Sequence, residues 1–230
     1  MCDVCGCEHP DPRPPRRVRI ELDLLARNNA LAAVNRRAFQ ARRLRVLNLM
    51  SSPGAGKTTL LVQTIRHLGG KWPIAVIEGD PQTQLDADRI RAAGGTAVQV
   101  NTGRGCHLDA AGVGRAAQEL DLADGGLLLL ENVGNLVCPA GFDLGEDHRV
   151  VILSVPEGDD KPRKYPALFA SADLLVINKI DLLPRVAFDL DRCVADARAL
   201  NPGLEVIRLS AHTGEHLQDW IAWLRLRTPA

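Results

Sequence analysis

A glycine-rich segment carries the residue types that bind polyphosphates. It reads SSPGAGKT from Ser51 to Thr58 and lies between two apolar stretches, LRVLNLM before it and TLLVQTIRHL after it. In a loop between a strand and a helix, glycines let the backbone wrap the phosphates, a lysine adds positive charge and a hydroxyl ligates Mg²⁺. Ser51 stands where this pattern usually has its first glycine. The predicted nucleotide contacts in this loop are Gly54, Ala55, Gly56, Lys57, Thr58 and Thr59.

A second motif, NKID, follows the apolar run LLVI and predicts that the base is guanine. The carboxylate of Asp181 can accept hydrogen bonds from the imino and amino groups of guanine, which adenine does not present together. We expect Lys179 to lie along the base and Asn178 to tie this loop to the phosphate-binding loop. In the later segment SAHTG, we expect Ser210 and Ala211 to complete the site, with the Ala211 amide facing the guanine oxygen. The sequence therefore predicts a site for GTP and GDP.

Two further apolar runs end in carboxylates that could serve a bound nucleotide. AVIEGD ends at Asp80, which we predict to bind the Mg²⁺ shell or to orient the attacking water; the alternative is a helix cap. LLLLENVGN places Glu131 and Gly134 in a loop expected to sense the γ-phosphate. The predicted catalytic residues for GTP hydrolysis are Lys57, Thr58 and Asp80, with Mg²⁺ on the last two.

The N-terminus holds a dense group of thiols, Cys2, Cys5 and Cys7. Three soft sulfur ligands and the nearby α-amino group could enclose one ion. Such a donor set suits square-planar Ni²⁺, and tetrahedral Zn²⁺ is the open alternative.

A second group of soft ligands comprises Cys106, His107 and Cys138. Cys106 lies just before a predicted helix, and we expect the helix N-terminus to lower the pKa of its thiol. Cys138 lies four residues beyond Gly134, so metal affinity and nucleotide state should be coupled. Because one chain offers few ligands here, two subunits of a homodimer could share the ion. The alternative is a buried thiol beside a capping histidine.

The elements that must position these residues follow an alternating pattern. Strands are predicted at residues 44–50, 74–77, 96–100, 127–130, 150–155, 174–178 and 206–209, with helical stretches between most of them. This predicts an α/β fold with a doubly wound, mostly parallel sheet flanked by helices, in which ligands bind at the carboxyl ends of the strands. We assign residues 20–230 to this domain, including a helix at 20–43, and residues 1–19 to a disordered metal-binding tail and Pro/Arg-rich linker.

Composition excludes several classes of function. The chain has 230 residues, 46% of them hydrophobic and 24% charged, with a formal net charge of zero. It has neither the basic stripe of a nucleic-acid-binding protein nor an apolar run of the roughly 20 residues that span a bilayer. We therefore expect a cytoplasmic protein that binds neither nucleic acid nor membranes. In that compartment the six cysteines are expected to be thiols or metal ligands.

These motifs together resemble the HypB family of nickel-incorporation GTPases. The matching segments are CxxCGC at 2–7, SSPGAGKTT at 51–59, VIEGDPQT at 76–83, GCHLD at 105–109, ENVGNLVCP at 131–139, NKIDLLP at 178–184 and SAHTGE at 210–215. The resemblance implies a dimeric GTPase of the SIMIBI class of P-loop NTPases. It further implies that GTP drives nickel delivery, with a HypA-type nickel chaperone, to the large-subunit precursor of a [NiFe]-hydrogenase.

The resemblance also assigns the metal ligands by position. It implies a tail site at Cys2, Cys5 and Cys7 and a second site at Cys106, His107 and Cys138. The alternatives are nickel delivery of the UreG type, which serves urease and has a Cys-Pro-His arrangement, and a zinc-binding regulatory GTPase. The sequence reads Cys-His at 106–107 without an intervening proline.

Overall fold

The computed structural model describes residues 16–80, 85–103 and 105–227, and for residues 16–22 the backbone alone. The predicted tail site at Cys2, Cys5 and Cys7 lies outside these residues and stays a prediction. Within the described ranges, no helix has the length and apolarity needed to cross a membrane.

The centre of the fold is a seven-stranded sheet in the order β3-β2-β4-β1-β5-β6-β7. Every neighbouring pair in it is parallel. The strands are β1 (Arg45–Ser51), β2 (Ile74–Asp80), β3 (Thr96–Asn101), β4 (Leu127–Gly134), β5 (His148–Ser154), β6 (Leu174–Asn178) and β7 (Glu205–Arg208). The predicted α/β fold with a doubly wound sheet is confirmed.

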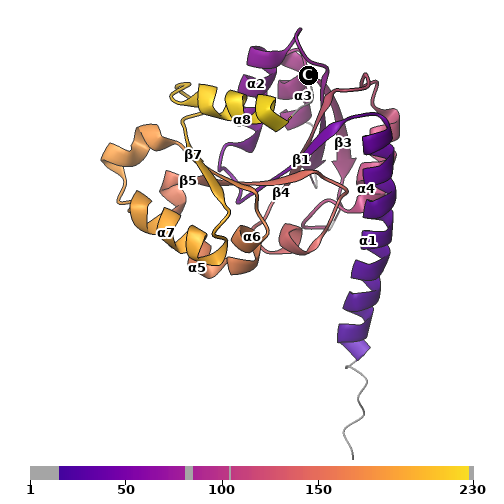
Figure 1. Cartoon of the computed structure of the whole chain (residues 1–230), viewed down its shortest axis with the longest axis horizontal. Coiled ribbons are helices and arrows are strands. Elements are labelled where there is room, and N and C mark those ends of the chain that lie inside the picture. The colour runs from indigo at the N-terminus through magenta and orange to yellow at the C-terminus, as the bar shows by residue number, and fades with distance from the viewer. Residues whose placement is uncertain (1–15, 81–84, 104, 228–230) are drawn as a thin grey trace, which may run out of the picture.

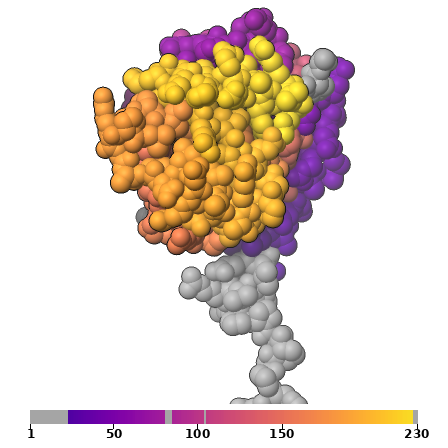
Figure 2. Space-filling model, turned by 60° about the vertical axis from the view of Figure 1, so that its left-hand side comes forward, coloured from indigo at the N-terminus to yellow at the C-terminus, as the bar shows by residue number. Residues whose placement is uncertain are grey.

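Helices cover both faces of the sheet (Figure 1). They are α1 (Arg16–Ala41), α2 (Lys57–Leu68), α3 (Leu85–Ala92), α4 (Ala110–Glu119), α5 (Lys161–Lys164), α6 (Pro166–Ala170), α7 (Leu190–Leu200) and α8 (Leu217–Arg227). Three 3₁₀ turns complete the elements: η1 (Cys138–Gly141), η2 (Val155–Glu157) and η3 (Ile180–Arg185). Figure 2 shows the face built by the last third of the chain, with the indigo residues of α1 along its right-hand edge.

The alternation of side chains along each strand explains this layering. In β1, Leu47 and Leu49 point into the core that α2, α3 and α8 cover. Val46 and Met50 point to the opposite face, where Val46 packs under α1 and α4, and Met50 under α6 and α7. Since both faces are buried, the strands are continuously apolar, as is typical of parallel sheets.

The first helix differs from its predicted limits of 20–43. It begins at Arg16, directly after Pro15, and ends at Ala41. Arginines are good helix formers, so the lack of apolar periodicity before Ile20 did not prevent helix formation. At the other end Arg43 adopts a left-handed conformation with φ 54°, which ends the helix. Phe39 then packs the helix onto the sheet.

Two strands continue further than predicted, and both lead into the candidate site. β2 includes Glu78 to Asp80, and β4 includes Glu131 to Gly134. Both pair in register, with Glu78 opposite Glu131. Their polar ends are therefore fixed by the ladder of the sheet, next to the loop that follows β1.

Candidate nucleotide and metal sites

The loop between β1 and α2 has the geometry of an anion-binding nest. Gly54 and Gly56 have φ values of +75° and +98°, a region that side-chain-bearing residues rarely adopt. Lys57 is 8% exposed and donates a 2.8 Å hydrogen bond from Nζ to Oγ of Ser51. Burial lowers the pKa of Lys57, and the nearby carboxylate of Glu131 opposes that shift. Ser51 therefore holds the lysine within the loop even though it replaces a glycine.

A cavity of about 560 Å³ opens at this loop. Of the predicted nucleotide and Mg²⁺ contacts, it is lined by Gly54, Gly56, Lys57, Thr58, Thr59, Asp80, Glu131, Gly134 and Lys179. The remaining loop residue, Ala55, is buried, and its carbonyl accepts a hydrogen bond from the Asn178 side chain.

Glu131 lies closer to the predicted Mg²⁺ site than the sequence suggested. The hydroxyl of Thr58 donates a 2.7 Å hydrogen bond to Oε1 of Glu131. Burial raises the pKa of Glu131 to about 7, although Lys57 and the bond from Thr58 act in the opposite direction. This is the arrangement of the acidic residue that, in P-loop NTPases, accompanies the Mg²⁺-binding hydroxyl. The sequence motif alone predicts Glu131 only in a loop that senses the γ-phosphate.

Glu78 is a second buried carboxylate in the cavity, and it was not among the predicted site residues. It is 2% exposed, and burial, followed by the charges of Glu131 and Asp80, raises its pKa to about 8. Oε2 of Glu78 and Oε2 of Glu131 have no hydrogen-bond partner among the described residues. The sequence feature that could have identified Glu78 is its position two residues before Asp80, because alternate residues of a strand share a face. Cavity-lining residues also missed are Asp86, Arg89 and Asn132.

The base-binding motif lines an adjoining cavity of about 320 Å³, which shares Gly56, Thr59 and Lys179 with the first. Asn178 donates a 2.8 Å hydrogen bond to the Ala55 carbonyl, so it ties the two loops together as predicted. Nζ of Lys179 donates a 2.7 Å hydrogen bond to the Gly54 carbonyl.

Asp181 offers an unused acceptor to this second cavity. Its Oδ1 is buried, and within the part of the chain that the structure describes no donor bonds to it. A buried carboxylate oxygen without a partner is costly unless a ligand supplies the donor. The two adjacent N–H donors of guanine fit this requirement.

Two expectations for the SAHTG loop need correction. The Ala211 amide does not face the base; it donates a 2.9 Å hydrogen bond to Oδ1 of Asn178, although Ala211 lines the base cavity. Ser210 is fully buried beneath the loop, where its hydroxyl accepts from Thr213 and its carbonyl from Gly214. Ser210 thus shapes the loop, and the neighbouring His212 lines the cavity instead. A five-residue pattern cannot show which backbone amides already form hydrogen bonds within the loop.

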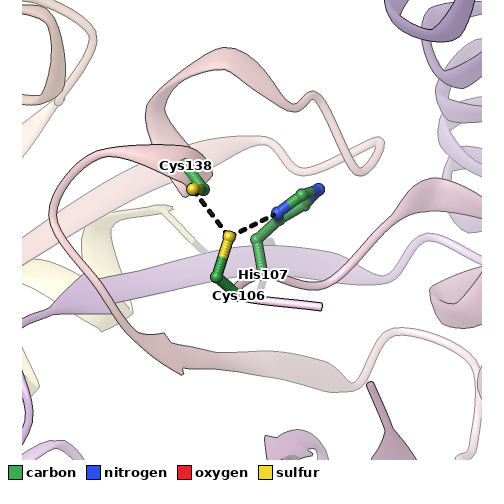
Figure 3. A group of neighbouring side chains, drawn as sticks. All are labelled: Cys106, His107 and Cys138. Atoms are coloured by element: carbon green, nitrogen blue, oxygen red, sulfur yellow. Dashed lines mark hydrogen bonds between the residues drawn. The ribbon is translucent and has the colours of Figure 1, made fainter. Parts of the chain in front are cut away.

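The structure brings the three predicted ligands Cys106, His107 and Cys138 together (Figure 3). Sγ of Cys106 lies 2.7 Å from Sγ of Cys138 and 3.6 Å from Nδ1 of His107. All three ligand atoms lie within 4.8 Å of one another, and each residue is half-buried. Cys138 begins η1, whereas the other two precede α4, so residues 32 positions apart form one site with an accessible side.

The protonation of this group differs from our expectation for Cys106. The hydrogen bond with Cys138 and burial raise the pKa of the Cys106 thiol. α4 begins only at Ala110, four residues after Cys106, and its N-cap Asp109 accepts from Gly112. Burial lowers the pKa of His107, whose ring packs against Phe142 at a tilt of 37°, with centroids 3.8 Å apart. His107 is therefore neutral near pH 7, the form that binds metals.

Comparison with known proteins agrees with this geometry. Residues 45–208 match the family model described as "CobW/HypB/UreG, nucleotide-binding domain". A protein of Azotobacter chroococcum named hydrogenase maturation factor HypB is 61% identical over 209 residues, which cover 91% of this chain and 68% of that protein. The chain belongs to the HypB group of the CobW/HypB/UreG family.

Solved structures place the chain in the same group. HypB from Archaeoglobus fulgidus superposes with a TM-score of 0.81 at 42% identity, over 87% of this chain and 98% of that one. HypB from Helicobacter pylori, crystallised with nickel, gives 0.82 at 37% identity, over 89% and 98%. The receptor FtsY of Elizabethkingia anophelis, at 15% identity and a TM-score of 0.53, shares the fold alone.

Proposed function

We propose that this chain is a nickel metallochaperone that hydrolyses GTP and thereby controls nickel transfer to a [NiFe]-hydrogenase precursor. The observation that carries the proposal is the contact between Cys106 and Cys138, whose Sγ atoms lie 2.7 Å apart; Cys138 lies four residues after the end of β4. The end of β4 is also the element whose Glu131 bonds to Thr58 in the nucleotide cavity. Strand β4 therefore connects the predicted phosphate site to the segment that carries the predicted metal ligand Cys138.

The nucleotide half of the proposal rests on the fit of the two cavities to GTP. Lys57 would neutralise charge on the β- and γ-phosphates, and Asp181 would select guanine. Thr58, Asp80 and Glu131 would hold Mg²⁺, which when bound supplies charge neutralisation to the phosphates. Asp80 would orient the attacking water. In the absence of a partner we expect hydrolysis to be slow, as in P-loop GTPases that wait for a stimulating protein.

The metal half rests on ligand chemistry. Two thiols and one imidazole suit Ni²⁺ and also Zn²⁺, so Ni²⁺ is proposed as the delivered ion and Zn²⁺ as its competitor. The half-buried position of all three residues leaves room for ligands from a second copy of the chain. We therefore retain the homodimer as part of the proposal. Cys2, Cys5 and Cys7 are proposed as a separate tail site.

The names of related proteins support the proposed partners. Proteins named hydrogenase maturation factor cover nearly all of this chain, which supports a hydrogenase precursor as the recipient and a HypA-type nickel chaperone as the partner. A UreG-type role in urease maturation is the alternative recipient.

Complementation tests this proposal. Cells that lack the chain should lose hydrogenase activity and regain it either with the wild-type chain or with excess nickel in the medium. The variants Lys57→Ala and Cys138→Ala should fail to restore activity at low nickel, whereas the control Cys193→Ala, a buried cysteine of α7, should restore it. Full activity with Cys138→Ala would favour a regulatory zinc protein instead.

A further inference from the structure

A buried hydrogen bond joins the nucleotide cavity to the metal-binding segment. Asn132 follows Glu131 in β4, lines the nucleotide cavity and is 1% exposed. Its Oδ1 accepts a 3.0 Å hydrogen bond from the backbone N–H of Leu108, the residue after His107. The same oxygen accepts from the amide of Val133, so the side chain is held in one orientation.

Leu108 makes a second contact with the edge of the cavity. Its fully buried side chain packs on Gly79, where an added Cβ atom would lie only 2.8 Å from the leucine. Gly79 lies between Glu78 and Asp80, and all three line the nucleotide cavity. The segment that carries Cys106 and His107 therefore rests on the ends of two strands, β2 and β4, both of which form the nucleotide site.

The end of β4 is in turn fixed to the phosphate-binding loop at two points. Thr58 bonds to Glu131 at 2.7 Å, and Gly134 lies so close to Pro53 that an added Cβ would meet the Pro53 nitrogen at 2.9 Å. The phosphate-binding loop is therefore in direct contact with the strand that carries Asn132.

The side-chain amide of Asn132 is also linked, through two further side chains, to the loop that follows Cys138 and η1. Its Nδ2 donates to Oδ1 of Asn48 at 3.2 Å, and Nδ2 of Asn48 donates to Oε1 of Glu146 at 3.3 Å. Oε2 of Glu146 accepts from the Leu144 amide, in the loop that follows η1 and Phe142. All members of this chain of hydrogen bonds are buried. A displaced Asn132 must either move both ligand-bearing segments or leave a buried donor without a partner.

We propose that Asn132 is the positioning residue that couples the nucleotide state to metal affinity at Cys106, His107 and Cys138. The inference rests on the proposed function, in which the two sites are coupled. Asn132 lines the nucleotide cavity, and in this proposal its side chain sets where the Cys106–Leu108 segment lies relative to Cys138.

The test measures Ni²⁺ affinity with the nucleotide state controlled. In a chain with Cys2, Cys5 and Cys7 changed to Ser, we expect Ni²⁺ dissociation constants with GDP and with a non-hydrolysable GTP analogue to differ by at least about 5-fold. Asn132→Ala should reduce that ratio to less than about 2-fold while GDP still binds. The matched control is Asn135→Ala. Asn135 bonds to the Cys106 carbonyl at 3.4 Å but does not line the nucleotide cavity, so its variant should keep the ratio.

The outcomes separate this inference from the proposal on which it rests. Equal affinities in the parent chain would overturn the proposed coupling itself. A ratio that survives Asn132→Ala would overturn only the role of Asn132.

A second measurement needs no substitution in this network. Hydrogen exchange of the Leu108 amide, followed in the wild-type chain, should differ between the GDP and GTP-analogue states by at least about 5-fold. The same protection in both states would overturn the role of Asn132 even if the alanine variant did not fold.

Discussion

The hydroxyl of Thr58 donates a 2.7 Å hydrogen bond to Glu131, a residue 73 positions later in the chain. The bond joins the start of α2 to the end of β4, so it fixes the phosphate-binding loop against the strand that leads to Cys138. A threonine oxygen can ligate Mg²⁺ through a lone pair while its O–H still donates to a carboxylate, so the same pair can serve the site with and without the ion.

Removal of that hydroxyl should impair hydrolysis. We expect Thr58→Ala to lower kcat for GTP at least about 10-fold and to weaken the dependence on Mg²⁺, because a charge-assisted bond and a metal ligand are lost together. Phosphate release measured over a Mg²⁺ titration checks this. Thr58→Ser keeps the hydroxyl and should retain most of the activity; an alanine variant with the wild-type Mg²⁺ dependence contradicts the assignment.

Asp181 should determine base preference. Asp181→Asn replaces the unpaired buried acceptor with a side chain that also donates, so GTP affinity should fall at least about 10-fold. Xanthosine triphosphate presents a carbonyl where guanine has its amino group, and the variant should bind it more tightly than the wild type does. Competition between the two nucleotides measures the change, and an unchanged preference for GTP would count against base reading by Asp181.

The pKa of Glu78 should make the stability of the nucleotide-free chain depend on pH. Burial raises this pKa from 4.5 to about 8, so the folded state holds a proton that the unfolded chain releases. Stability should therefore fall as pH rises from about 4.5 to about 8.

The variant Glu78→Gln removes that dependence, because glutamine stays neutral at every pH. Without Mg²⁺ or nucleotide, we expect its Tm to exceed that of the wild type by at least about 2 °C at pH 8.5 and by less than about 1 °C at pH 5. Thermal melts at both pH values test this. Glu119→Gln, at an exposed position of α4, is the control and should shift Tm equally at both. Equal shifts for Glu78→Gln would rule out the raised pKa.

Metal binding should depend on Cys138 and not on Cys193. In a chain with Cys2, Cys5 and Cys7 changed to Ser, the further change Cys138→Ser should weaken Ni²⁺ binding at least about 10-fold, since one soft ligand is lost. Cys193 is fully buried in α7, and burial raises the pKa of its thiol to about 12. Cys193→Ala should therefore leave the Ni²⁺ dissociation constant unchanged. A competition assay with a chromophoric chelator measures both.

Periodicity in the sequence was enough to predict the sheet. Each apolar run became a strand, because a parallel strand buried on both faces needs apolar residues at nearly every position. The limits of β2 and β4 could not be predicted, since their last residues are polar and belong to the sheet only through pairing with neighbours. Glu78 was missed for this reason.

The candidate site could be predicted where the chemistry of a single side chain indicates its role. Lys57 and Asp181 line the cavities to which their chemistry assigned them, and the three predicted metal ligands lie together. A role was not predictable where it depends on whether a neighbouring side chain already forms a hydrogen bond with the group concerned. The Ala211 amide donates a hydrogen bond to Asn178, and the Cys106 thiol donates one to Cys138.

The most direct test of the account is the Ni²⁺ dissociation constant of the site formed by Cys106, His107 and Cys138, measured with the three tail cysteines changed to Ser. The account predicts that exchanging GDP for a non-hydrolysable GTP analogue changes this constant at least about 5-fold. The same constant in both nucleotide states would contradict it.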